Sequence, residues 1–261
     1  MTRVALVTGA ARGIGAATVD LLCEQGMVVA AVDWPGGEAP SGVEHALATA
    51  ADLDRVAARH PGLVLPYPAD VRDRVALDRV VADLLERYGR IDVAVAAAAV
   101  IVGGLPLWEH TPEQVGSVLG VDALGVWNTA SAVIPAMLAG PDPSGCRFVA
   151  VTSPAGEGGL FGLGGYVMAK HACVGVVRAL AADLTGTGVV ACGVSPGSTR
   201  TDMLAATAAL YDLDDVEPLA DAGGLQRLLE PVEVARVIAF CCSAAGTALN
   251  GSIVAATGTG P

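Results

Sequence analysis

The 261-residue chain has a length typical of one large α/β domain, and 53% of its residues are hydrophobic. Its net charge of −12 argues against a nucleic-acid partner. The longest apolar run, Val93 to Val102, is too short to span a bilayer, so no membrane association is expected. We find no signal peptide, no C-x-x-C spacing among the six cysteines and no metal-ligand cluster, which predicts a cytoplasmic protein with free thiols and no metal.

Apolar strand-like runs alternate with helical periodicity, which predicts a doubly wound, mostly parallel sheet of about seven strands flanked by helices. The expected strands are Val4–Thr8, Val28–Val32, Leu63–Tyr67, Asp92–Ala97, Arg147–Thr152, Val189–Val194 and Ser252–Ala255. The expected helices are Gly13–Gln25, Val75–Tyr88, Thr111–Leu138, Tyr166–Leu184 and Pro231–Cys242. No repeat or linker divides the chain, so residues 1–261 are predicted to form a single domain.

The turn between the first strand and the first helix is rich in glycine. Gly9 permits a tight turn, Gly13 lets backbone approach a pyrophosphate, and Gly15 allows close helix–strand packing. The free N–H groups of the helix N-terminus favour phosphate there. A plain tight turn would explain the glycines alone, but Asp33 follows the second strand, where a carboxylate accepts from an adenosine ribose and repels a 2′-phosphate. This favours NAD over NADP, although Arg12 could contact a 2′-phosphate.

The only lysine of the chain, Lys170, follows Tyr166 by four positions. At helical spacing the two side chains share one face. A neighbouring ammonium favours the phenolate, so the spacing predicts a tyrosine with a lowered pKa that acts as a general acid/base.

Two further segments are predicted to border the ligand site. Residues 34–61 are longer than a direct strand–helix–strand connection needs and contain an amphipathic stretch over Leu47–Ala58. Residues from about 200 to 229 are expected to form a substrate lid over the carboxyl ends of the strands. An apolar pocket near Ser153 is expected from Leu105, Trp108, Phe161 and Leu163, and the acidic cluster Asp212, Asp214, Asp215 and Glu217 is expected to be a solvated face.

Together these motifs resemble the short-chain dehydrogenase/reductase family over essentially the whole chain, which implies a single-domain Rossmann-type fold. The resemblance implies that Tyr166 exchanges a proton with the substrate oxygen, that Lys170 holds the nicotinamide ribose, and that Ser153 hydrogen-bonds the substrate. The residues implied to bind the cofactor are Gly9, Arg12, Gly13, Ile14, Gly15, Asp33, Asp70, Val71, Ala97, Ala98, Tyr166, Lys170, Pro196, Gly197, Thr199 and Thr201.

Two positions depart from the family pattern. The usual Asn-Asn-Ala-Gly after the fourth strand is replaced by Ala96-Ala97-Ala98-Ala99, which removes an amide that braces the central strands. The usual catalytic Asn of the long helix is replaced by Asp122, which is expected to accept from a water bridging to Lys170.

The predicted function is NAD-dependent interconversion of a secondary alcohol and a ketone, a reaction on CH–OH groups, with a small apolar substrate. Alternatives are an NADP-dependent ketoreductase and a catalytically silent dinucleotide-binding regulator. The long connection over residues 34–61 is similar to the branch linked to mycofactocin, which implies NAD held without free exchange and mycofactocin as redox partner. Family resemblance also implies a homotetramer.

Overall fold

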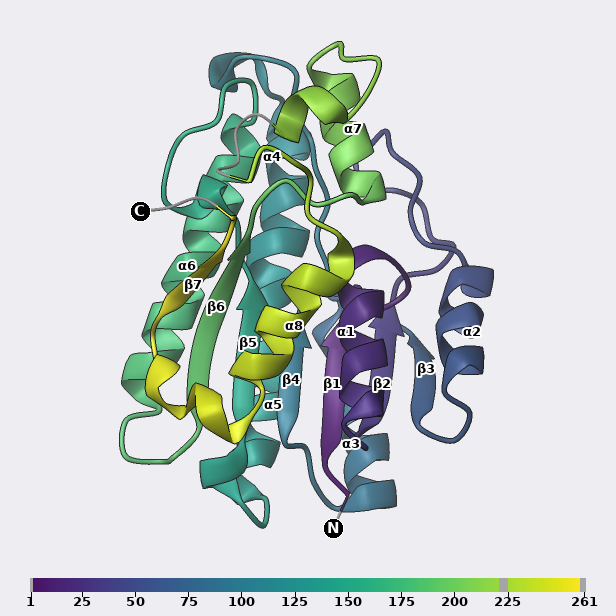
Figure 1. The fold of residues 1–261 in the computed structure, drawn as a ribbon, viewed down its shortest axis with the longest axis vertical. Coiled ribbons are helices and arrows are strands. Elements are labelled where there is room, and N and C mark those ends of the chain that lie inside the picture. The colour runs from purple at the N-terminus through teal and green to yellow at the C-terminus, as the bar shows by residue number, and fades with distance from the viewer. Residues whose placement is uncertain (1, 221–224, 259–261) are drawn as a thin grey trace.

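The computed structural model describes residues 2–220 and 225–258, and its centre is a seven-stranded sheet in which every strand is parallel to its neighbours (Figure 1). The strand order is β3-β2-β1-β4-β5-β6-β7. The strands are β1 Val4–Thr8, β2 Val28–Asp33, β3 Val64–Pro68, β4 Val93–Ala96, β5 Arg147–Val151, β6 Val190–Pro196 and β7 Ile253–Ala256. The predicted doubly wound, Rossmann-type architecture is confirmed, with strand boundaries displaced by only one or two residues.

Helices cover both faces of the sheet, as a parallel sheet requires. On one face α1 Gly13–Glu24, α2 Ala50–Arg59 and α8 Pro231–Cys241 enclose a core of small aliphatic residues. On the other face α3 Arg74–Tyr88, α5 Gly125–Ala139 and α6 Gly164–Asp183 pack around the fully buried Phe148. Helices α4 Pro112–Val118 and α7 Asp202–Leu210 lie beyond the carboxyl edge of the sheet, at the top of Figure 1.

The long helix expected over Thr111–Leu138 is not uniform. A capping box between Thr111 and Gln114 starts α4, but the segment Leu119–Leu124 is π-helical before α5 continues to Ala139. π-Helical turns insert an extra residue per turn and often mark functional positions. Among the described residues this helix, Pro112–Ala139, is the one long and apolar enough to cross a membrane, but 67% of its most apolar window is buried in the protein, as in a core helix.

The exposed faces of α5 and α6 carry apolar side chains, including Trp127 and Met168. The homotetramer implied by the family resemblance stays a prediction.

Phe148 is central to the core because its ring is fully buried near the start of β5, beside Ala94 of β4. We predict that Phe148→Ala lowers the free energy of unfolding by about 3–5 kcal/mol, through lost burial and the cavity it leaves. Phe161→Ala is the matched control, because that ring is 86% exposed, and it should change stability by less than about 0.5 kcal/mol. Urea unfolding of the three proteins measures both effects, and equal losses for the two variants would contradict the assigned core.

Candidate active site

A cavity of about 770 Å³ opens at the carboxyl edge of the sheet, within the size range of ligand sites. It is lined by the turns that leave β1, β2, β4, β5 and β6 and by the start of α6. All of the predicted cofactor-binding residues line it: Gly9, Arg12, Gly13, Ile14, Gly15, Asp33, Asp70, Val71, Ala97, Ala98, Tyr166, Lys170, Pro196, Gly197, Thr199 and Thr201. Ser153 also lines the cavity, whereas Asp122 lies behind its wall.

The glycine-rich turn has no room for side chains. Gly9 and Gly13 adopt positive φ angles of 65° and 55°, which strain other residues. A Cβ atom at Gly15 would lie 2.0 Å from the Gly9 carbonyl oxygen, and one at Gly9 would lie 2.7 Å from the Ala98 nitrogen. No side chain caps the N-terminus of α1, and Gly13, Ile14 and Gly15 of its first turn line the cavity, where helix N–H groups favour a phosphate. The turn therefore fits a dinucleotide.

The carboxylate of Asp33 is fixed at the end of β2 by two backbone donors. Oδ2 accepts from the N–H of Ala11 at 2.8 Å, and Oδ1 accepts from the N–H of Trp34 at 2.8 Å. Burial raises the pKa of Asp33, and these N–H donors and the nearby Arg12 oppose that rise. A carboxylate accepts about four hydrogen bonds, so two backbone donors leave capacity for ribose hydroxyls.

Arg12 is engaged by protein groups on both sides of the cavity. Its guanidinium forms an ion pair with Asp202 of α7 at 2.8 Å and donates to the carbonyl of Ala46 at 2.7 Å. The sequence leaves open whether Arg12 serves a 2′-phosphate. In the structure its donors tie the glycine-rich turn to the lid and to the segment before α2.

The connection between β2 and α2 forms a cover over the cavity, defined here as residues 34–49. Within it Trp34, Pro40, His45, Leu47 and Ala48 line the cavity, and Val43 is buried against α4 and the π-helical segment. His45 Nε2 accepts from the N–H of Ile101 at 3.4 Å, a long contact. The cover therefore extends beyond the expected ribose end to the segment that follows β4.

Two buried side chains that the sequence analysis missed brace the cavity floor. The hydroxyl of Thr8 accepts from the N–H groups of Ala97 and Ala98 at 3.1 and 3.3 Å, and so ties β1 to the turn after β4 where the family amide is missing. The amide of Asn128 donates to the carbonyl of Val71 at 2.9 Å. The only sequence signal for either is a polar residue within an apolar run.

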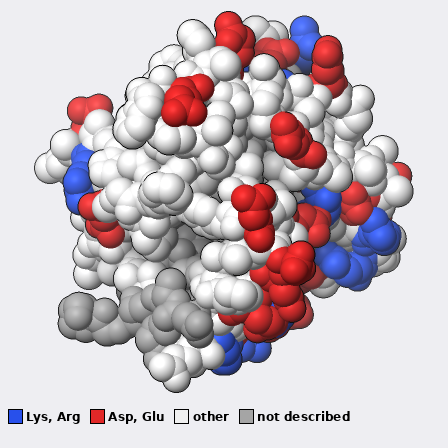
Figure 2. All heavy atoms as spheres, turned by 90° about the horizontal axis from the view of Figure 1, so that it is seen from above, with Lys and Arg blue, Asp and Glu red and all other residues white. Residues whose placement is uncertain are grey.

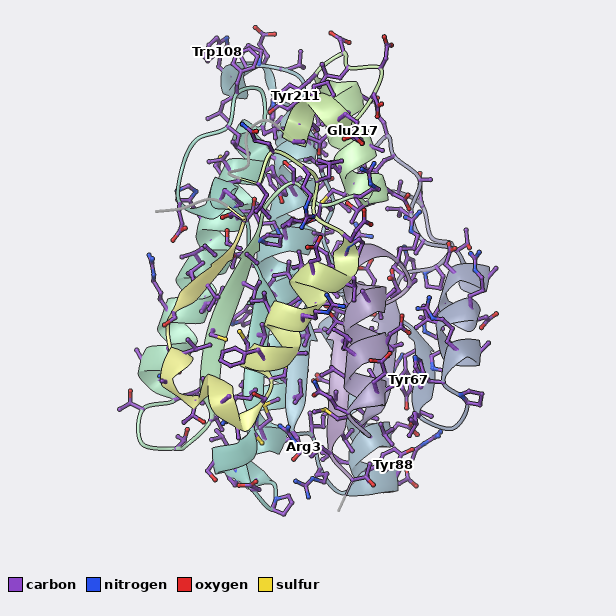
Figure 3. The ribbon with its side chains drawn as sticks, viewed as in Figure 1. Arg3, Tyr67, Tyr88, Trp108, Tyr211 and Glu217 are labelled. Carbon is purple, nitrogen blue, oxygen red and sulfur yellow. The ribbon has the colours of Figure 1, made fainter. Side chains whose placement is uncertain are left out.

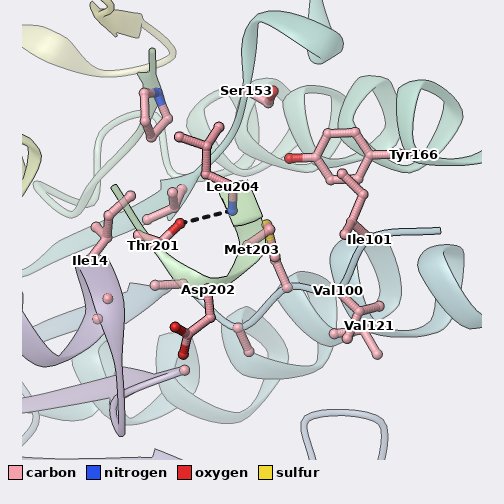
Figure 4. Close-up of a pocket in the computed structure, with 18 of the residues that line it drawn as sticks. Ile14, Val100, Ile101, Val121, Ser153, Tyr166, Thr201, Asp202, Met203 and Leu204 are labelled. Atoms are coloured by element: carbon pink, nitrogen blue, oxygen red, sulfur yellow. Dashed lines mark hydrogen bonds between the residues drawn. The ribbon is translucent and has the colours of Figure 1, made fainter. Parts of the chain in front are cut away.

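Helix α6 brings Tyr166 and Lys170 together, as the four-residue spacing predicts. Figure 4 shows the Tyr166 hydroxyl pointing into the cavity, with the Ser153 hydroxyl on the same side. Ser153 caps the turn after β5 by accepting from Ala155 N–H at 3.1 Å, and its hydroxyl lies close enough to Tyr166 to lower the pKa of that phenol. Lys170 Nζ lies 5.5 Å from the centroid of the Tyr166 ring and donates to the carbonyl of Val151 at 3.2 Å.

The pKa of Tyr166 moves in the direction opposite to the one expected. Burial raises it above the ordinary value, and Lys170 and Ser153, which lower it, do not outweigh the combined effect of burial and the Asp122 carboxylate. The sequence analysis considered the ammonium but not the cost of placing a phenolate in a dry site.

The outer part of the cavity is apolar. Leu160, Leu163, Met203, Leu204 and Tyr211 line it, and the Tyr211 hydroxyl donates to the carbonyl of Phe161 at 2.7 Å. The expected contribution of Leu105, Trp108 and Phe161 is wrong, because these side chains do not line the cavity and are 41%, 84% and 86% exposed. Figure 3 shows Trp108 at the top edge of the molecule.

The segment expected to form a lid contains α7, and its residues Met203, Leu204, Thr207, Tyr211 and Leu219 line the cavity. Its role as a lid stays a prediction, and residues 221–224 of that prediction lie outside the described part of the chain. The acidic cluster is exposed as expected, and Glu217 pairs with Arg200 at 2.8 Å. Figure 2, which looks down on this end, shows scattered acidic side chains on a largely uncharged surface. No group of metal-ligating residues occurs in residues 2–220 and 225–258.

Comparisons with known proteins agree with this geometry. A family model described as enoyl-(acyl carrier protein) reductase matches residues 9–258. The chain is 38% identical over 206 residues to an uncharacterised NAD-dependent oxidoreductase of Mycobacterium tuberculosis, covering 77% of this chain and 73% of that protein. It is 32% identical over 257 residues to meso-2,3-butanediol dehydrogenase of Serratia marcescens, covering 98% and 93%. Carveol dehydrogenase of Mycobacterium avium in complex with NAD superposes with a TM-score of 0.91 at 26% identity, covering 98% and 96%.

We predict that Gly15→Ala weakens dinucleotide binding more than tenfold, because a Cβ at this position would collide with the Gly9 carbonyl and displace the turn. Gly175→Ala is the control, since a Cβ there meets nothing within 4 Å and alanine favours the helix. Isothermal titration of each variant with NAD measures the effect. Wild-type affinity in Gly15→Ala would show that the turn does not hold the phosphates.

Proposed function

The chain belongs to the short-chain dehydrogenase/reductase family, and on that premise we propose that it is an NAD-dependent oxidoreductase that interconverts a secondary alcohol and a ketone. The observation that carries the proposal is the meeting of the Ser153 hydroxyl, the Tyr166 phenol and the Lys170 ammonium at the cavity that the glycine-rich turn borders. The names of relatives that act on diols and on carveol support alcohol chemistry.

NAD suits the residues at the ribose end better than NADP. Asp33 offers acceptors to ribose hydroxyls and would repel a 2′-phosphate, and Arg12 already pairs with Asp202. NAD-bound structural relatives support this assignment. When bound, NAD supplies the acceptor for the hydride that leaves the substrate carbon.

The chain's own residues handle the proton and the developing charge. During oxidation Tyr166, as phenolate, takes the hydroxyl proton of the alcohol, and during reduction the phenol returns it to the ketone oxygen. Ser153 donates to that same oxygen, so two hydroxyl groups stabilise the charge that develops there. Lys170 holds the ribose and stabilises the phenolate through its charge. The apolar outer lining suits a small or medium apolar substrate and excludes water.

We predict that Tyr166→Phe lowers the rate of alcohol oxidation by about 10²–10⁴-fold, the usual contribution of a general acid/base, while NAD remains bound. A screen of secondary alcohols with NAD, and with an artificial electron acceptor, identifies the substrate for this measurement. Tyr88→Phe is the control, since Tyr88 lies at the opposite end of the molecule in Figure 3. Unchanged turnover by Tyr166→Phe would reject the assigned acid/base.

We also propose that NAD is retained between turnovers and re-oxidised in place, with mycofactocin as the redox partner. Two contacts support retention: the cover lines the cavity along residues 34–48, and Arg12 joins the cover to α7 across the glycine-rich turn. Because the Arg12 side chain ties the cover to α7, it would slow the separation of these two segments around a bound dinucleotide.

Denaturing the purified protein should therefore release about one NAD per chain, and Asp202→Asn should speed NAD loss in buffer. The expected acceleration is a few-fold, because the Asp202 side chain is 66% exposed and such ion pairs contribute about 0–1 kcal/mol. Asp214→Asn, which removes an exposed charge from the same segment, serves as control. Chromatography of the supernatant measures both results. Purified protein that releases no nicotinamide nucleotide would contradict retention.

A further inference from the structure

Asp122 and Lys170 form a buried ion pair behind the wall of the cavity. Asp122 is fully buried and Lys170 is 2% exposed. Oδ2 of Asp122 lies 3.1 Å from Nζ of Lys170. This contact is direct and leaves no space for a water between the two atoms, unlike the bridge that the sequence predicts. Lys170 therefore meets a full negative charge where the family pattern has a neutral amide.

The π-helical segment sets the position of this carboxylate. Asp122 lies within Leu119–Leu124, which packs against α6, and its Oδ1 accepts from the N–H of Val100 at 2.9 Å. Oδ2 forms no hydrogen bond of good angular geometry with the described residues and faces only the ammonium. Both oxygens thus face donors. Burial raises the pKa of Asp122, and Lys170 and the Val100 N–H oppose that rise. A protonated carboxyl would point its hydrogen at one of these two donors, so both of them favour the ionised form.

The charged and titratable groups around the pair come from α6 and from the cover. Tyr166 and Cys173 on α6 and His45 on the cover all interact electrostatically with Asp122, Lys170 or both. Burial alone would lower the pKa of Lys170, but Asp122, Tyr166 and Cys173 together more than reverse this, with Asp122 the largest of the three, and the ammonium stays protonated. Burial raises the pKa of Tyr166, Lys170 lowers it, and Asp122 raises it again.

We propose that Asp122 is a positioning residue that neutralises the charge of Lys170 and so keeps the Tyr166 phenol protonated to a higher pH than Lys170 alone would allow. This rests on the proposed function of Tyr166 as the acid/base. A protonated phenol is the form that carbonyl reduction needs, and the phenolate is the form that alcohol oxidation needs. The charge balance therefore keeps reduction active toward higher pH and makes oxidation depend on alkaline conditions.

Asp122→Asn isolates the charge, because the amide oxygen can still accept from the N–H of Val100 and the side chain keeps its size. We expect the pH midpoint of alcohol oxidation to move toward acid by about one unit, the lower end of the effect of a neighbouring charge. Well below the wild-type midpoint, this corresponds to about tenfold faster turnover in the variant. Asp183→Asn is the matched control, because it removes one exposed charge from the C-terminal end of α6, far from Tyr166 and Lys170. The pH midpoint of alcohol oxidation by this variant should equal that of the wild type.

A purely structural role for Asp122 predicts a different result. Turnover would then fall by the same factor at every pH while the midpoint stayed in place, and that outcome would overturn the proposal. A midpoint that moves toward alkali in Asp122→Asn would overturn it as well.

Direct titration of the phenol tests the inference without turnover. The ultraviolet absorbance of tyrosinate in the wild type, minus that of Tyr166→Phe, follows Tyr166 among the four tyrosines of the chain. We expect Tyr166 to ionise above the ordinary value of about 10 in the wild type and at lower pH in Asp122→Asn. Ionisation of wild-type Tyr166 near neutrality would overturn the proposal, even where Asp122→Asn does not fold. If the wild-type protein is inactive toward every alcohol, the proposed function is rejected. The titration of Tyr166 then still tests the proposed role of Asp122 by itself.

Discussion

The parallel direction of all seven strands is the constraint on which the site depends. Because every strand ends at the same edge, the turns after β1, β2, β4, β5 and β6 open around one cavity. Val and Ala predominate in β1, β2, β4 and β7, and their small side chains allow both helical layers to approach the sheet closely. The functional groups are therefore supplied by residues at the ends of the strands or just beyond them, such as Asp33 and Ser153, while the strands provide a rigid base.

Most of the fold and the residues around the cavity were predictable because their signals are local. Buried apolar runs mark the strands, the glycines mark a turn whose positive φ angles need them, and the spacing of Tyr166 and Lys170 fixes a shared helical face. Long-range partners were not predictable. Nothing near Arg12 in the sequence indicates that its guanidinium pairs with Asp202, and nothing near Thr8 indicates that its hydroxyl braces Ala97.

Two errors have a common physical origin. Trp108 and Phe161 are large apolar side chains and were expected to line the pocket, yet both are mostly exposed. The lowered pKa expected for Tyr166 came from a neighbouring charge considered without its surroundings. In both cases the outcome depends on the solvent exposure of the side chain in the folded protein, and the spacing of residues in the sequence does not indicate that exposure.

The coordination of Lys170 explains why the chain's only lysine occurs here. An ammonium has three donors on a compact head. One of them donates to the Val151 carbonyl, and the charge also pairs with the Asp122 carboxylate at 3.1 Å. Lys170 also lines the cavity, so its ammonium can donate to a ligand as well. A guanidinium is a wide planar fork that cannot direct single donors to three separate partners in so small a space. The other residues of the Lys and Arg count are all arginine, so lysine occurs only where a compact point charge is required. The Asp122 carboxylate offsets the cost of burying this ammonium.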